Sequence, residues 1–136
     1  MENYNEEIIK GIRESISNGE YGLTTKIKGL EVWFWGNKLE EVSDEMIAFA
    51  LDIVNAYQDN REKYDGEALE VVKSYLSKDE KVDDLTIMNQ LGIPIIDVAT
   101  EAGACLMYGE VKEIGNHMPE VRLNRELDVG DIALNR

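Results

Sequence analysis

Residues 30–57 constrain the fold more than any other segment, because they join an aromatic strand to an amphipathic helix. The strand part contains both tryptophans of the chain, Trp33 and Trp35. Side chains alternate between the two faces of a strand, so these two share one face. Ser43 then suits a helix N-cap, and apolar residues recur at helical spacing as far as Tyr57. The segment predicts a sheet with a helix packed on it.

Shorter patterns upstream of this segment predict a helix and a hairpin. Isoleucines at helical spacing indicate a helix over about residues 5–17, which ends before an Asn-Gly turn signal. Residues 21–28 then alternate, and Gly29 supplies a turn into the aromatic strand. Residues 21–35 are therefore predicted to form a β-hairpin.

Downstream, the helical pattern continues in shorter pieces. Asp65 and Gly66 break the periodicity, and a second apolar stripe follows over residues 68–76. The apolar spacing over residues 85–91 predicts a short third helix, which ends at Gly92.

The C-terminal part of the chain predicts strands. Residues 104–108 form an unbroken apolar run, whereas residues 120–124 alternate. Residues 95–100 fit a buried strand or a helical turn equally well. The alternation over residues 127–134 changes phase at Gly130-Asp131, where a bulge or bend would restore a single strand face.

Because helices and strands lie in separate blocks, the expected class is α+β. We expect an antiparallel or mixed sheet of about five strands, with two to three helices packed on one face and a short N-terminal helix. A chain of 136 residues has the usual size of one domain, so residues 1–136 are expected to form a single domain.

Charge restricts the kinds of partner. The chain has 28 acidic and 14 basic residues, a net charge of −14 at pH 7. Nucleic acid and anionic membranes repel such a surface, whereas a basic protein is attracted to it. An acidic surface that only keeps the domain soluble is the simpler alternative. Cys105 is the sole cysteine, and the acidic start lacks the order of a signal peptide, so we expect a cytoplasmic protein.

The sequence holds little that indicates catalysis. His117 is the only histidine and lies beside a turn, and Cys105 lies in an apolar run. A Cys–His nucleophile pair stays open, although no third orienting group is apparent. No phosphate-binding loop, zinc motif or twelve-residue calcium loop occurs, so neither a metal nor a cofactor is predicted.

Two sets of residues are candidates for binding. The far face of the helix after Ser43 is acidic, and the carboxylates proposed to meet a partner are Asp44, Glu45, Asp52 and Asp59, with Glu62 as an extension. The second set is aromatic and comprises Trp33, Trp35 and Tyr108. These three can line a pocket or an interface, but burial of the tryptophans under a helix is the preferred interpretation.

The chain also resembles small bacterial domains of unknown function. The similarity lies in the segments Tyr21-Gly22-Leu23 and Leu30-Glu31-Val32-Trp33-Phe34-Trp35-Gly36, followed by two helices, and in the ending that runs through Gly115-Asn116-His117-Met118-Pro119 to Asp128-Val129-Gly130-Asp131-Ile132-Ala133-Leu134. Some members of that group are similar to immunity proteins, which bind and neutralise a toxin. The resemblance implies no catalytic residues.

Three functional hypotheses follow. The first is a non-enzymatic binding module of immunity type, whose acidic helical face engages a basic partner such as a toxin domain. The alternative is a small enzyme or ligand-binding domain with a pocket between sheet and helices. In the third, the aromatic strand forms the interface of a homo-oligomer.

Overall fold

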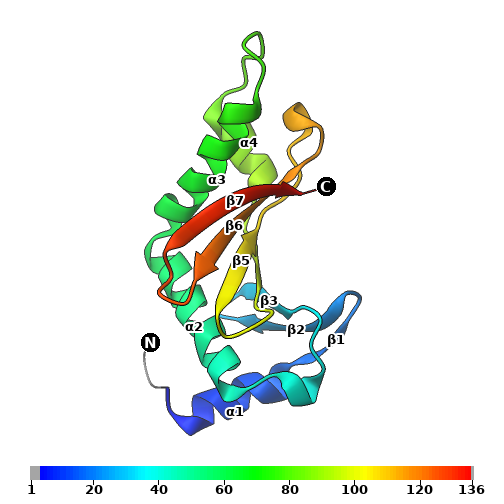
Figure 1. Cartoon of the computed structure of the whole chain (residues 1–136), viewed down its shortest axis with the longest axis vertical. Helices are drawn as coiled ribbons and strands as arrows, with labels where there is room; N and C mark the ends of the chain where they lie inside the picture. The colour runs from blue at the N-terminus through cyan, green and yellow to red at the C-terminus, as the bar shows by residue number, and fades with distance from the viewer. Residues whose placement is uncertain (1–3, 136) are drawn as a thin grey trace.

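A computed structural model describes residues 4–135, which form one seven-stranded sheet and four α-helices (Figure 1). The helices are α1 (Glu6–Ser15), α2 (Asp44–Asp59), α3 (Arg61–Tyr75) and α4 (Asp84–Leu91). The strands are β1 (Ser17–Gly19), β2 (Gly22–Ile27), β3 (Leu30–Phe34), β4 (Ile95–Asp97), β5 (Gly103–Met107), β6 (Met118–Asn124) and β7 (Val129–Asn135). Short 3-10 turns occur at Leu39–Glu41 and Lys112–Ile114.

The strands lie side by side in chain order, from β1 to β7. Only β3 and β4 are parallel, with Val32 opposite Ile96, and every other neighbouring pair is antiparallel. A tight turn cannot connect parallel neighbours, so the chain crosses from β3 to β4 through α2, α3 and α4. Figure 1 shows α2 and α3 following one another along one side of the sheet, with α1 near β1 and β2.

The core lies between this helical layer and one face of the sheet. The helix α2 starts as predicted, because the Ser43 hydroxyl oxygen accepts a hydrogen bond from the backbone N–H of Met46 at 3.2 Å. The predicted apolar stripe of α2 is buried, and its members are Met46, Ile47, Ala50, Leu51, Ile53, Val54 and Tyr57. It packs over alternate residues of the strands, including Val32, Phe34, Ile96, Leu106 and Val121.

The expected class is confirmed, but the expected sheet is too small. Seven strands replace about five, and the four helices are α1, at the place of the expected N-terminal helix, and three more between β3 and β4. The extra strands are short. The strand β1 lies where a turn was expected after the first helix. The segment 95–100 fitted either a strand or a helical turn, and its first three residues form the strand β4. Strands of three residues carry too little alternation to be detected from sequence.

The predicted break at Asp65-Gly66 is wrong. The helix α3 runs through both residues, and Asp65 is buried inside it. Gly66 weakens a helix, but buried contacts made by the neighbouring residues outweigh that local preference.

The predicted irregularity at Gly130-Asp131 is confirmed. Val121 on β6 pairs with Ile132, and Leu123 pairs with Val129. Between these two pairs, β6 advances by two residues and β7 by three, so β7 contains one extra residue, which defines a β-bulge. The bulge lets one strand keep its apolar residues on the core side.

Among residues 4–135, no helix has the length and apolar character needed to cross a membrane.

Candidate binding face

The opposite face of the sheet is not covered by any part of the described chain, and its outward residues Glu31, Trp35 and Arg122 are exposed. The strand register aligns outward side chains of five strands in one row: Thr24, Trp33, Asp97, Cys105 and Arg122. A second row contains Ile95, Met107, Glu120 and Ala133. This uncovered face therefore mixes aromatic, apolar and charged groups.

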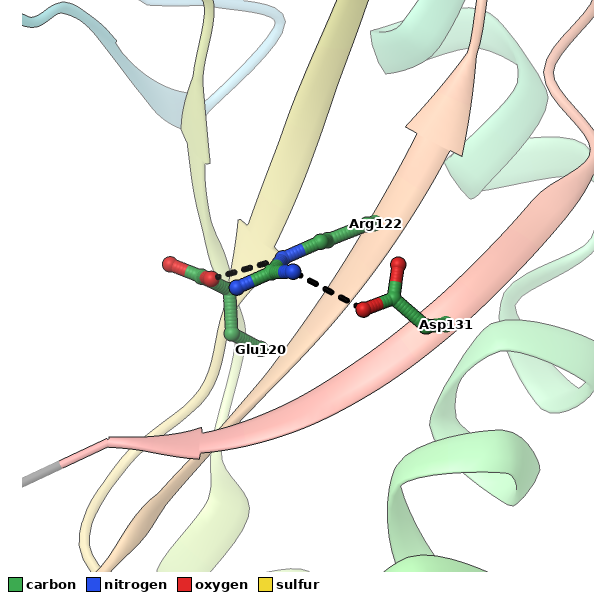
Figure 2. A network of polar contacts seen from close by, with 3 residues as sticks. All are labelled: Glu120, Arg122 and Asp131. Carbon is green, nitrogen blue, oxygen red and sulfur yellow. Dashed lines mark hydrogen bonds and ion pairs between the residues drawn. The ribbon is translucent and has the colours of Figure 1, made fainter.

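Arg122 is held between two carboxylates on this face, as Figure 2 shows. Its Nε lies 3.3 Å from Oε2 of Glu120, and its Nη1 lies 2.8 Å from Oδ2 of Asp131. The Glu120 side chain is only 16% exposed, whereas that of Asp131 is 71% exposed. Exposed ion pairs contribute little to stability, so these contacts chiefly orient the guanidinium.

Asp97 lies beside this trio and is partly buried. Burial raises the pKa of its carboxyl, the backbone N–H of Trp35 lowers it by donating a hydrogen bond at 3.2 Å, and the nearby charge of Glu120 raises it. The uncovered face thus concentrates negative charge near the centre of the sheet.

Cys105 pairs with Asp97 on one side and with Arg122 on the other. Partial burial raises the pKa of its thiol from 9.0 to about 11, and the charges of Glu120 and Asp97 add to the rise. A nucleophilic cysteine requires the opposite shift, because the thiolate is the reactive form. The thiol of Cys105 is therefore almost fully protonated at neutral pH.

This shift predicts the alkylation behaviour of Cys105. At pH 8 the raised pKa lowers the thiolate fraction about 100-fold relative to a cysteine with the ordinary value of 9.0. The more basic thiolate is also more nucleophilic, which offsets part of this loss, so iodoacetamide should react about tenfold more slowly. The rate should keep rising about tenfold per pH unit up to roughly pH 11. Replacing Glu120 with glutamine removes one source of the shift and should increase the rate at pH 8. A rate that reaches its plateau near pH 9 would contradict the shift.

A groove of about 570 Å³ lies on the same face. Its lining comes from several strands and includes Tyr21, Trp33, Trp35, Ile95, Met107 and Glu120. The ring centroids of Tyr21 and Trp33 are 5.6 Å apart, and those of Trp33 and Trp35 are 6.4 Å apart. The three rings therefore form a continuous aromatic wall.

The preferred interpretation of the tryptophans is wrong, because neither lies under a helix. Trp35 is 52% exposed, and Trp33 is half-buried by its ring neighbours on the uncovered face. Tyr108 borders the same groove, but its side chain is 2% exposed and its hydroxyl reaches Asp65 in the core. Trp33 and Trp35 thus lie together on the uncovered face of the sheet, whereas the side chain of Tyr108 points into the core between sheet and helices.

Two of the five predicted acidic residues are held by contacts within the chain. Asp44 accepts a hydrogen bond from Arg13 Nη2 at 2.7 Å, and Asp52 accepts one from the hydroxyl of Tyr4. Both contacts come from α1 or the residues just before it. The N-terminal segment therefore holds two of the predicted acidic side chains, although the Asp44 side chain stays 71% exposed.

The other three acidic residues, Glu45, Asp59 and Glu62, are exposed. Within residues 4–135, their side chains take part in no hydrogen bond or ion pair. Asp59 and Asp52 also border a hollow of about 330 Å³, whose rim includes Arg125 from the turn between β6 and β7.

Asp65 is the buried charged group that sequence reasoning missed. Its Oδ1 accepts hydrogen bonds from the hydroxyls of Tyr57 at 2.9 Å and Tyr108 at 2.8 Å. Its Oδ2 lies 3.5 Å from Nε of Arg61. Burial, followed by the contact with Asp65, raises the pKa of both tyrosines. Asp65 shares a helical stripe with Ala68 and Val72, and that spacing was the available signal.

His117 lies apart from these groups, just before β6, where it pairs with Val111. Its Nδ1 is buried without a hydrogen-bond partner among the residues that the structure describes. Among residues 4–135, no hydrogen bond joins His117 to Cys105. Within the same range, no cluster of three or more His, Cys, Asp or Glu side chains has the geometry of a metal site.

Comparisons with family models, curated proteins and solved structures find no significant match to this chain.

Proposed function

We propose that this chain is a non-enzymatic protein-binding module of immunity type, which acts in the cytoplasm and engages a basic protein such as a toxin domain. The observation that carries the proposal is the acidic patch, defined as Glu45, Asp59 and Glu62. These side chains are exposed and form no hydrogen bond or ion pair within residues 4–135, so they can pair with a partner's lysines and arginines.

The position of the acidic patch suits a broad interface. Glu45 and Asp59 lie at opposite ends of α2, and Glu62 lies in the first turn of α3, which follows after one residue. Sixteen residues of helix span roughly 24 Å, the width of an ordinary protein–protein contact. The net charge of −14 adds long-range attraction for a basic partner.

The test is a charge-reversal variant that carries Glu45→Lys, Asp59→Lys and Glu62→Lys. The wild-type chain is used to isolate a basic protein from the source cells, and association kinetics of the pair are measured at several salt concentrations. The variant should associate about tenfold more slowly at low salt and show a weaker salt dependence, because surface charges act mainly on encounter rates. Asp52 is left unchanged, since it binds Tyr4.

A matched control separates the patch from the overall charge. Asp79→Lys, Glu80→Lys and Glu101→Lys change the net charge equally but lie in the exposed loops after α3 and after β4. This control variant should associate clearly faster than the patch variant. Equal association rates of the patch variant and the wild type would refute the proposed interface.

A further inference from the structure

The two edges of the sheet differ in how they are protected against pairing with another strand. The edge strand β1 has only three residues, and all of them are exposed. The opposite edge strand, β7, has seven residues and contains neither lysine nor proline, which commonly block an edge (Figure 1). Its bulge lies near its start, so residues 132–135 pair regularly with β6. Within residues 4–135, no strand pairs with the outer side of β7.

Ile132 and Leu134 direct their backbone groups to this open edge. Each residue of an antiparallel strand turns its N–H and C=O to the same neighbouring strand, and successive residues alternate. The Pro119 carbonyl accepts a hydrogen bond at 3.0 Å from the residue that follows β5, so Glu120 turns to β7 instead. Glu120 pairs with Ala133, which therefore turns back to β6. The residues on either side of Ala133 thus each leave an N–H and a C=O unpaired.

A second copy of β7 matches this edge when the two strands pair antiparallel about Ala133. Ile132 then lies opposite Leu134 of the other copy, and each such pair exchanges two hydrogen bonds, so the open groups of both residues are used. Both side chains are half-buried and lie on the helix-covered side of the sheet. The apolar layer therefore continues from one copy into the other, while Asp131 lies opposite the neutral Asn135.

Charge along the open edge also permits a second copy. Asp131 is the only charged residue of β7, and its Oδ2 lies 2.8 Å from Nη1 of Arg122. Pairing about Ala133 brings no two charges of β7 opposite each other. The net charge of −14 still repels two copies over longer distances, and salt screens that repulsion. Self-association should therefore strengthen as salt is added.

We propose that this chain forms a two-fold symmetric homodimer by antiparallel pairing of β7 with β7 of a second copy, so that one sheet continues through both copies. The aromatic strand β3 cannot pair in this way, because β2 and β4 occupy both of its edges. The homodimer does not depend on the proposed function, and the two differ in sign. Salt weakens association with a basic partner, whereas it strengthens the homodimer.

Sedimentation velocity of the full chain over a range of protein concentrations, at low and at high salt, measures the monomer–dimer equilibrium. We expect a dimer with a dissociation constant of about 1–100 µM at high salt and association about fivefold weaker at low salt. A chain that stays monomeric in every condition, or a dimer that weakens as salt is added, would overturn the inference.

Leu134→Pro tests the open edge with little change to the sheet itself. Proline removes the N–H that points outward, and the hydrogen bonds between β6 and β7 do not use it. Each dimer loses two hydrogen bonds, so dimerisation should weaken at least about tenfold, while circular dichroism of the monomer stays unchanged.

Trp35→Ala is the control for the edge variant, because it changes an exposed residue on the uncovered sheet face, which the proposed pairing leaves free. Its dimerisation should equal that of the wild type. A dimer that is lost in Trp35→Ala and kept in Leu134→Pro would place the interface on the sheet face and overturn the inference.

Disulfide cross-linking tests the register independently of the proline variant. In a Cys105→Ser background, Ala133→Cys places two thiols in a non-hydrogen-bonded pair whose Cα atoms are about 4.5 Å apart, within disulfide reach. Asn135→Cys is the matched control, because the same register separates its two copies by four residues, roughly 13 Å. Mild oxidation should convert most of the first variant and little of the second into a covalent dimer. Equal cross-linking of the two variants would overturn the proposed pairing.

Discussion

Replacing Asp65 with alanine should lower the free energy of unfolding by about 3 kcal/mol. Asp65 is 6% exposed, and a single oxygen, Oδ1, accepts the hydroxyls of Tyr57 and Tyr108. Both tyrosines are 2% exposed, so neither hydroxyl finds water when the carboxylate is removed. Each unpaired buried hydroxyl costs about 1–3 kcal/mol, and the truncation adds a small cavity. Chemical denaturation with a check for an unchanged m-value measures the loss.

Asp65→Asn is the matched control for this prediction. Asparagine keeps an oxygen that can accept both tyrosine hydroxyls and loses only the contact with Arg61, whose side chain is 55% exposed. Its cost should be about 1 kcal/mol or less. The control therefore separates loss of the acceptor from loss of the charge.

A mutant cycle isolates the network itself. In the background Tyr57→Phe with Tyr108→Phe, no hydroxyl depends on Asp65, so Asp65→Ala should cost much less than in the wild type. The same cost in both backgrounds would show that the network contributes nothing to stability.

Gly109→Ala is expected to have the second largest effect, a loss of about 3 kcal/mol. A Cβ at Gly109 would lie 2.4 Å from the carbonyl oxygen of Gln90 and 3.2 Å from that of Leu91. These are backbone atoms at the end of α4, and they cannot move away as a flexible side chain would. Gly109 also donates its N–H to the Leu91 carbonyl at 2.9 Å, so relief of the clash breaks a hydrogen bond. Thermal and chemical denaturation measure the effect.

Gly66→Ala makes the same chemical change where the structure leaves room. A Cβ at Gly66 meets no atom within 4 Å, and the residue lies inside α3. Alanine should raise the free energy of unfolding there by about 0.5–1 kcal/mol. If both variants destabilise the protein to a similar degree, the close approach at Gly109 is not the cause.

Local patterns identified the parts of the fold that depend on near neighbours. The start of α2 follows from Ser43 and its buried face from apolar spacing, because a cap and a helical period involve only a few consecutive residues. The hairpin of β2 and β3 and the bulge at Gly130-Asp131 were detectable for the same reason.

Local patterns gave wrong predictions where contacts between residues far apart in the sequence determine the structure. Asp65 beside Gly66 has the local signature of a break, and only Tyr57 and Tyr108 make its burial in α3 favourable. At α4 the predicted stripe is also displaced: Leu85 is 69% exposed, while Ile87 and Leu91 are buried. A helix of eight residues, about two turns, carries too little pattern to tell which side meets the core.

For the candidate sites, the sequence by itself determined which residues share a strand face or a helix face. Trp33 and Trp35 had to lie together, as did Glu45 and Asp59, because residue spacing sets these relations within one element. Only the tertiary structure decided that the helices cover the other face of the sheet, which leaves the tryptophans on the uncovered face, and that Arg13 of α1 and Tyr4 just before it contact Asp44 and Asp52. The physical reason is that packing between elements depends on contacts across the whole chain, which no local pattern encodes.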